Sequence, residues 1–245
     1  MRGSSPPGKS SGATIVTVGR LPRIPLPALA VLCLVLVTTA LALVFFVVPN
    51  DADQGFSQRI FYFHVSIAIT AYACFAAGAW QALRHLWKRD PRADLAGYVA
   101  VHQGVIFGVL VLLTGSIWAK ISWGHWWLWS EDQLVLFLVL FLFYCAYFML
   151  RFSVEPGPQR ANMSAVYALF GVVLIPVSFA AIRLAKGLIH PVVFTRHGPN
   201  FGGWILVTYC VAQAAMLVLA YTLYRVELAG KQLDARLRAV REVLA

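Results

Sequence analysis

The chain has 245 residues, of which 60% are apolar and only 12% are charged, and its mean hydropathy is +0.74. This composition excludes an ordinary water-soluble domain. The formal net charge of +10 does not indicate nucleic-acid binding, because the basic residues form short clusters between long apolar runs, as in the loops beside membrane helices.

Residues 1–24 are predicted to form a flexible cytoplasmic N-terminal tail, because they are rich in Gly, Ser, Pro and Arg and lack apolar periodicity. The apolar run at 25–48 is too long for the hydrophobic region of a signal peptide, and no small-residue cleavage site follows it. We therefore expect this run to be retained as the first membrane helix.

Five further apolar runs predict five more membrane helices, so the expected fold is an all-α integral membrane protein with six transmembrane helices. Each run is long enough, or nearly so, to cross ~30 Å of hydrocarbon. Helices are the expected spanning structure because backbone groups in lipid must satisfy their own hydrogen bonds. The six-helix domain is assigned to residues 25–224, and residues 225–245 are predicted to be a cytoplasmic amphipathic segment suited to the inner membrane surface. The five runs lie at 60–83, 101–121, 134–150, 164–184 and 204–224.

The basic residues predict the orientation. Fifteen of the 20 lysines and arginines lie in the tail, the second and fourth loops and the C-terminal segment. Since basic loops stay on the cytoplasmic side, both termini are predicted to be cytoplasmic, with loops one, three and five external. The five basic residues on the opposite side are Arg59, Lys120, Arg183, Lys186 and Arg196.

A Trp-rich segment at about 118–133 lies between the third and fourth predicted helices. Tryptophan favours membrane interfaces, so part of this cluster fits an aromatic belt. A helical turn would bring Trp123, Trp126 and Trp127 to one side and form a flat wall for a planar apolar ligand. From spacing alone, a binding platform and a membrane-seated belt fit equally well. The five tryptophans of the segment are Trp118, Trp123, Trp126, Trp127 and Trp129.

Four of the six histidines fall on the external side in this topology, namely His64, His125, His190 and His197, whereas His85 and His102 fall on the cytoplasmic side. Two neutral imidazoles on opposite faces of a macrocycle can bind haem axially. A single histidine near a helix end is more often hydrogen-bonded to backbone or headgroups. His64 is predicted to lie about one turn inside its helix, and His190 precedes a proline that would end a helix near the bilayer surface.

Two sequence blocks resemble a known family. TGSIWAK followed by WGHWWLWSED (114–120 and 123–132) resembles the WGxWWxWD signature of the haem-handling membrane proteins of cytochrome c maturation, the CcmC/CcsA-type family of WWD-domain proteins. The closest branch is CcmC, the haem exporter protein C. SQRIFYFHV, which contains His64, is similar to the SxRIxYxHV-like stretch of that branch, and His190 matches its second histidine after the fifth helix. The resemblance covers about residues 54–190.

The resemblance implies a site on the external face. In it, His64 and His190 are axial ligands to the metal of a transiently and non-covalently bound haem b, and the indoles of the Trp-rich loop form its platform. The propionates are expected near Arg59, Lys120, Arg183 or Arg196. No bond in haem need break, so we expect a binding and delivery protein of the bacterial-type inner membrane and not an enzyme. The platform residues are Trp123, Trp126, Trp127 and Trp129.

The resemblance also implies partners. These are a membrane-anchored periplasmic haem chaperone (CcmE-like), ABC transporter subunits (CcmA/CcmB-like) and a small single-helix subunit (CcmD-like), besides membrane lipid. Two positions depart from the family pattern: Ser130 stands where the family has Asp after the last tryptophan, and Ser66 stands where it has proline after the first histidine. Asp132 occupies the place of the family's following Arg. Of the functions that the resemblance implies, docking of the chaperone is the one that these changes are expected to affect most.

Two other classes of function remain open from the sequence. A b-type electron-transfer subunit would need histidine pairs at bundle depth, and only His64 is expected to enter a helix to any depth. A small-molecule permease would need internal repeats, broken helices or charges near the midplane, which are not evident. A c-type cytochrome is excluded because CxxCH is absent, and ATP hydrolysis by this chain is not expected because no Walker A sequence is present.

Overall fold

Six long helices dominate the computed structural model, and each is long and apolar enough to cross a membrane. The structure describes residues 24–52, 54–184 (side chains as far as residue 180), 193–195 and 198–244. The predicted all-α fold with six spans is confirmed. In chain order the elements are α1 (Leu26–Ala42), the π-helix η1 (Leu43–Val47), the 3-10 helix η2 (Phe56–Gln58), α2 (Arg59–Lys88), α3 (Pro91–Trp123), α4 (Asp132–Ser153), α5 (Pro158–Leu184), β1 (Phe194–Thr195), β2 (Gly198–Pro199) and α6 (Gly203–Leu244).

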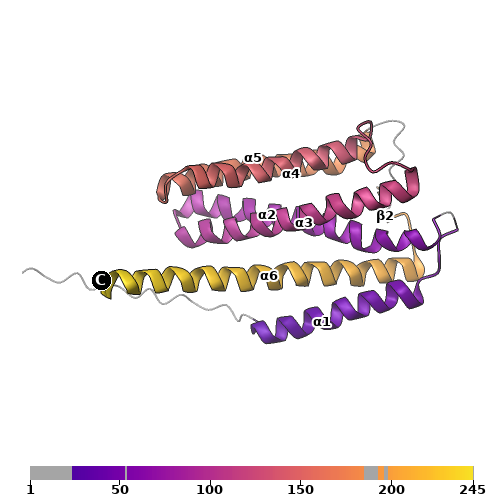
Figure 1. Cartoon of the computed structure of the whole chain (residues 1–245), viewed down its shortest axis with the longest axis horizontal. Coiled ribbons are helices and arrows are strands. Elements are labelled where there is room, and N and C mark those ends of the chain that lie inside the picture. The colour runs from indigo at the N-terminus through magenta and orange to yellow at the C-terminus, as the bar shows by residue number, and fades with distance from the viewer. Residues whose placement is uncertain (1–23, 53, 185–192, 196–197, 245) are drawn as a thin grey trace, which may run out of the picture.

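The helices form three layers of two (Figure 1). α4 and α5 pack together on one side, α2 and α3 form the middle layer, and α6 with α1 forms the other side. α2 is the most central helix, because it packs extensively on α3 and also contacts α5 and α6. A side chain on α2 is therefore within reach of several helices at once.

The two ends of the bundle differ in what they carry. The first residues of α1 and the last residues of α6 lie toward the same end (Figure 1), as an even number of spans requires. We call the opposite end the loop end. It carries the starts of α2, α4 and α6, the end of α3 at Trp123 and the antiparallel pair β1–β2.

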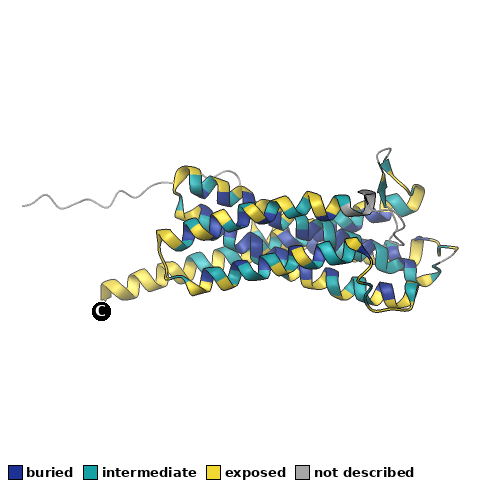
Figure 2. Cartoon of the chain, turned by 90° about the horizontal axis from the view of Figure 1, so that it is seen from above, coloured by how far each residue is buried: buried dark blue, intermediate teal, exposed yellow. Residues whose placement is uncertain are grey.

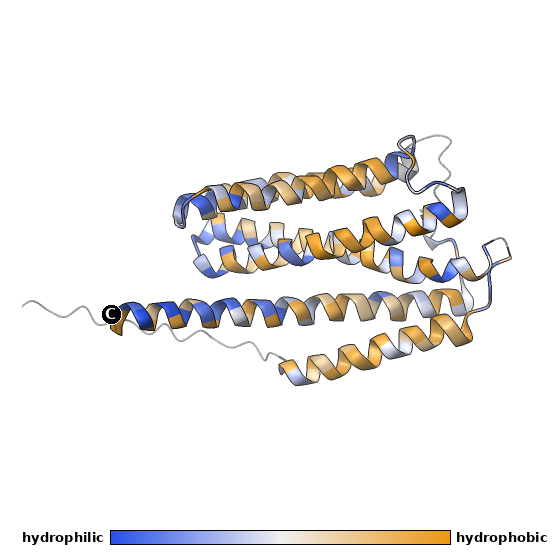
Figure 3. Cartoon of the chain, viewed as in Figure 1, coloured by the Kyte–Doolittle hydropathy of each residue, from blue (hydrophilic) through white to orange (hydrophobic). Residues whose placement is uncertain are grey.

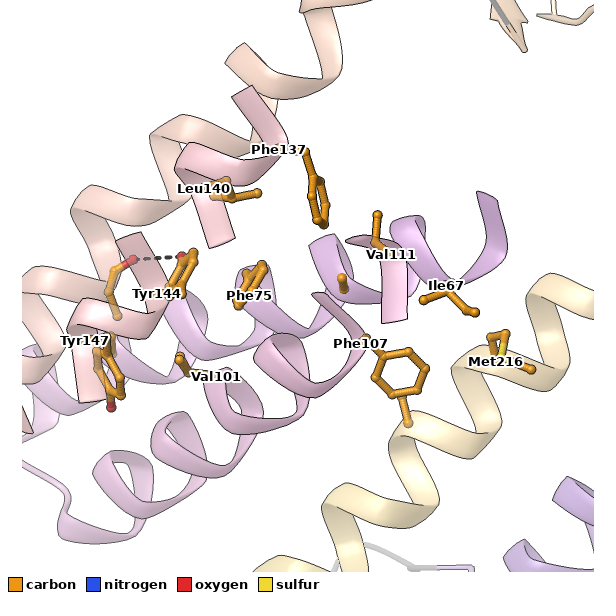
Figure 4. Close-up of a cluster of buried hydrophobic side chains, with 14 of the residues drawn as sticks. Ile67, Phe75, Val101, Phe107, Val111, Phe137, Leu140, Tyr144, Tyr147 and Met216 are labelled. Atoms are coloured by element: carbon orange, nitrogen blue, oxygen red, sulfur yellow. Dashed lines mark hydrogen bonds between the residues drawn. The ribbon is translucent and has the colours of Figure 1, made fainter. Parts of the chain in front are cut away.

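The centre of the bundle is an aromatic core at the α2–α3–α4 junction. Phe75 of α2 stacks on Tyr144 of α4 with ring centroids 3.9 Å apart and planes 3° from parallel (Figure 4). Phe75 fits there because Gly104 of α3 has no side chain, and a Cβ on Gly104 would lie 2.5 Å from Phe75 Cδ1. Small residues allow membrane helices to approach closely in this way.

Buried residues line the inner faces of the helices, whereas their outer faces are exposed in the isolated chain (Figure 2). Those outer faces are largely apolar along the middle of the bundle, with hydrophilic residues concentrated toward its ends (Figure 3). α1, for example, exposes Val31 and Leu34, and η1 exposes Phe46. This distribution matches a bundle whose middle is solvated by lipid.

α6 continues without a break to Leu244. At ~1.5 Å per residue its 42 residues measure roughly 63 Å, about twice the ~30 Å of hydrocarbon. Residues 225–244 are therefore an extension of the spanning helix, and the sequence-based division at residue 225 does not correspond to the start of a separate helix. The predicted tail at 1–24 lies, except for Ile24, outside the described residues.

Candidate functional site

His64 lies on α2 near the loop end, five residues after Arg59, the first residue of that helix. This spacing puts it roughly 7–8 Å along the helix axis. Its side chain is half-buried between α2 and α3. The prediction that His64 lies inside its helix is confirmed.

Thr114 of α3 is the hydrogen-bond partner of His64 Nδ1. Thr114 Oγ1 donates its hydrogen to the Leu110 carbonyl oxygen at 2.7 Å and lies 2.9 Å from His64 Nδ1. When the single hydroxyl hydrogen is directed to Leu110, the Thr114 oxygen accepts from a protonated Nδ1. The lone pair is then on Nε2, the arrangement found in histidines that ligate metals through one nitrogen and donate through the other.

Gly115 gives the imidazole its space. A Cβ on Gly115 would lie 2.9 Å from His64 Cε1, closer than such atoms ordinarily approach. The ring therefore rests directly on the backbone of α3, with its orientation set by the neighbouring Thr114.

His64 borders an apolar cavity at the loop end. The cavity holds about 930 Å³ of space free of atoms, including its opening to the outside. Ligand pockets are mainly apolar with a few placed polar groups. Aromatic rings from six segments line it, namely Tyr72 of α2, Trp118 and Trp123 of α3, Trp127 of the following loop, Phe137 of α4, Phe179 of α5 and Phe194 of β1.

Two residues that line the cavity each have a buried polar atom without a hydrogen-bond partner among the described residues. They are the indole nitrogen Nε1 of Trp127, a donor, and the amide oxygen Oε1 of Gln133, an acceptor. Buried polar atoms are normally paired, so both residues have unused hydrogen-bonding capacity beside this space. An apolar molecule with a polar edge and a metal able to accept the His64 lone pair fits this wall.

The Trp-rich segment is not a continuous helix. α3 ends at Trp123, because Gly124 has the left-handed φ of 78° that closes a helix. The helical spacing expected for Trp123, Trp126 and Trp127 therefore does not apply, and that part of the prediction is wrong. Trp123 and Trp127 line the cavity, whereas Trp126 and Trp129 are 60% and 73% exposed and are not among its lining residues.

The indoles also do not form a flat wall. Trp118 and Trp123 meet edge to face, with centroids 5.0 Å apart and planes at 72°. Trp127 and Trp129 meet at 5.7 Å and 66°. Edge-to-face pairs hold each ring in place, so Trp129 supports Trp127 from outside the cavity.

A second cavity adjoins the first. It holds about 970 Å³, including open space, and four residues line both cavities: His64, Val65, Trp118 and Val193. Its wall is more polar, with Asp51, Gln54, Gln58 and Asn200 among its lining residues. Trp118 Nε1 donates to Gln54 Oε1 at 3.3 Å across this wall. His64 thus stands between an apolar space and a more polar one.

The structure describes the side chains of only two of the five basic residues on the predicted external side. Arg59 donates to Asn50 Oδ1 and lies 4.4 Å over the Phe56 ring, and it lines neither cavity. Lys120 donates to the Gly124 carbonyl at 2.9 Å. The predicted ligand His190, as well as Lys186, Arg196, His197 and the Arg183 side chain, lies outside the described residues.

The remaining described histidines lie away from the cavities. His125 is exposed in the Trp-rich loop. His102 lies 11 residues inside α3, where its Nδ1 is 2.9 Å from Glu227 of α6, and His85 is buried near the other end of α2. The expectation that only His64 enters a helix is therefore wrong for His102, because α3 begins ten residues before the predicted apolar run.

Many residues of the site were not identified from the sequence, among them Thr114, Gly115 and Gln133. Thr114 and Gly115 belong to the TGSIWAK block, in which only Trp118 and Lys120 were candidate site residues from the sequence. Their roles depend on which α2 residue faces them, and a single sequence does not give the register between two helices.

A family model described as "Heme exporter protein C" matches residues 13–242 of the chain. Three proteins of that name show similarity. That of Paracoccus denitrificans is 33% identical over 145 residues, covering 59% of this chain and 60% of that protein. That of Bradyrhizobium diazoefficiens is 29% identical over 198 residues, covering 80% and 75%. That of Escherichia coli K12 is 32% identical over 152 residues, covering 62% of each. The chain thus matches about three fifths of the length of the first and third of these proteins.

Proposed function

The chain belongs to the Heme exporter protein C family, and from this premise we propose that it binds haem at the loop end of the bundle and presents it for cytochrome c maturation. One observation carries the proposal: the His64 imidazole and the indoles of Trp123 and Trp127 line the same apolar cavity. The loop end is then the external face of a bacterial-type inner membrane, and both termini are cytoplasmic, as the basic residues indicate.

In this proposal His64 Nε2 is one axial ligand of haem b and His190 is the other. Val193, which lines both cavities beside His64, is the third residue after His190. A chain of three residues spans at most about 11 Å, so the chain permits His190 to approach the same metal. Binding is non-covalent, because none of the four cysteines lines either cavity and CxxCH is absent.

The chain's own residues hold and orient the cargo. Thr114 keeps the lone pair on His64 Nε2, the apolar rings exclude water from the macrocycle, and Trp127 Nε1 can donate to a polar group at its edge. Haem supplies only an iron that accepts two imidazoles. No bond in haem is broken in this proposal, so the chain acts as a delivery protein.

The partner surface is proposed to include the exposed indoles of the Trp-rich loop. Trp126 and Trp129 stand outside the cavity with most of their surface exposed, and Trp is enriched at the centre of protein interfaces. A periplasmic CcmE-like haem chaperone would meet this surface, on which Ser130 replaces the acidic residue of the family motif. CcmA/CcmB-like transporter subunits and a CcmD-like single-helix subunit would complete the complex.

Replacing Thr114 by valine should weaken haem binding by about 10- to 100-fold, the usual cost of losing the hydrogen-bond partner of a metal-ligating histidine. Valine has nearly the shape of threonine but leaves Nδ1 without its acceptor. The measurement is haem titration of the purified protein, with the absorption spectrum recorded at each step. Thr114→Ser keeps the hydroxyl and should restore both affinity and spectrum. Equal affinity in Thr114→Val and the wild type would show that this hydrogen bond does not orient the ligand.

The proposed function is tested on the full chain purified from haem-replete cells. We expect substoichiometric haem that an excess of apomyoglobin removes, because a delivery protein must release its cargo. A tightly held, stoichiometric haem that cycles between two oxidation states without exchange would instead indicate an electron carrier. Absence of haem in the purified protein, together with no binding on titration, would favour a permease.

A further inference from the structure

The extension of α6 beyond the bundle carries an apolar stripe that the described part of the chain leaves uncovered. The stripe follows alternating steps of four and three residues, which place its members on one face of the helix. All of them are exposed, and a Cβ on Gly230 would meet nothing within 4 Å. The stripe consists of Val226, Gly230, Leu233, Leu237, Val240 and Leu244.

This stripe prolongs a packing face used elsewhere on the same helix. Ala212 and Ala215 of α6 are buried in a cluster with Ala40 and Val44 from α1 and η1. Val226 follows Ala215 by 11 residues, about three helical turns, and so lies on nearly the same side. α1 begins at Leu26, and α6 extends well past it (Figure 1). The face of α6 that α1 covers within the bundle therefore continues beyond the bundle, where α1 no longer covers it.

The membrane surface does not suit this stripe as its partner. An amphipathic helix that binds a membrane lies in the interfacial plane. Residues 225–244 instead continue the spanning helix along its own direction, away from the bundle (Figure 1). The stripe is thus presented to a neighbour that stands beside the helix outside the membrane.

The flanking charges argue against a second copy of this chain. Beside the inner positions Leu237 and Val240, the flanking positions are Arg236 and Arg241. Nearer the bundle the same flanks carry Asp234 and Glu227, and Glu227 already pairs with His102 and Lys231. Two copies in one membrane extend their helices in the same direction, and a parallel pair then sets Arg236 of each against Arg241 of the other. Acidic residues beside the apolar face of a different helix would pair with both arginines.

We propose that this stripe is the docking surface for a helix of another protein, apolar at its inner positions and acidic at the flanking positions that face Arg236 and Arg241. Docking of this kind couples the membrane domain to a partner on the side of the termini, and it does not depend on haem binding at the loop end. A three-heptad peptide represents that partner, with leucine at the inner positions, glutamate at the flanking positions that face Arg236 and Arg241, and alanine opposite Asp234. The glutamates of two such peptides would repel each other, so the peptide stays monomeric.

The test measures binding of the labelled peptide to the full chain in neutral-lipid nanodiscs. We expect saturable binding that the same peptide with lysine for glutamate does not show. Leu237→Asp should weaken binding by about 10- to 100-fold, since it removes one buried leucine. Ala235→Asp adds the same charge on the opposite, exposed face and should have little effect. The double substitution Arg236→Glu with Arg241→Glu should reverse the preference between the two peptides.

Three outcomes overturn the proposal. The first is that the glutamate peptide fails to bind or that Leu237→Asp leaves its binding unchanged. The second is that a cysteine at position 237, in a chain without its four own cysteines, becomes protected from maleimide when anionic lipid is added, which would assign the stripe to the membrane. The third is that this cysteine forms a disulfide between two copies in high yield, which would assign it to a self-interface.

Discussion

Replacing His64 by alanine should leave the purified protein almost without haem. The loss should exceed the ~10- to 100-fold weakening expected for Thr114→Val, because the ligand itself is removed and not its hydrogen-bond partner. The cavity and its aromatic wall remain in this variant, so free imidazole added to the protein can occupy the vacated space. We expect imidazole to restore part of the haem content and of the wild-type absorption spectrum.

His125→Ala is the matched control for this experiment. His125 belongs to the Trp-rich loop but is exposed and lines neither cavity, so its removal should leave the haem content unchanged. His190→Ala should behave like His64→Ala. Full retention of haem in both the His64 and the His190 variants, each with an unchanged elution volume on size exclusion, would refute the assignment of these two histidines as ligands.

The positions of the six helices could be predicted because each apolar run must cross the hydrocarbon. Their ends could not be predicted from hydropathy, because polar residues extend several helices beyond the membrane. α2 ends at Lys88 and α3 begins at Pro91, whereas the apolar runs stop at 83 and resume at 101. The sequence nevertheless contains the signal for the second boundary: Asp90 caps α3 by accepting from the Arg92 backbone N–H, and proline follows it.

From the sequence, only the candidate metal ligand and the Trp-rich segment of the site could be predicted. His64 stands out because a polar ring inside a membrane helix has few partners. The division of the tryptophans into cavity-lining and exposed rings depends on Gly124, which ends α3 before Trp126. Pairing of Thr114 with His64 depends on the register of α3 against α2, which comes from packing contacts such as Gly104 on Phe75. No single-sequence pattern contains that register.

Enlarging Gly115 should disrupt haem binding in proportion to the size of the new side chain. A Cβ at this position would lie 2.9 Å from His64 Cε1, so even alanine forces the imidazole to shift by a few tenths of an ångström. Gly115→Ala should therefore alter the absorption spectrum of the bound haem, and Gly115→Leu should fill part of the cavity and remove most of the haem. Overpacking of this kind also costs about 1–3 kcal/mol of stability, so the effect on the site must be separated from the effect on the fold.

Gly104→Ala separates the two effects, because it overpacks the same pair of helices away from the cavity. A Cβ on Gly104 would lie 2.5 Å from Phe75, a residue of the bundle core that lines neither cavity. We expect Gly104→Ala to lower the thermal unfolding temperature at least as much as Gly115→Ala does, while leaving the haem spectrum unchanged. If the spectrum instead followed the loss of stability in both variants, the imidazole would be held by the general packing of α2 on α3. A spectral change confined to Gly115→Ala would show that the bare backbone at this glycine, together with Thr114 beside it, sets the position of the ligand.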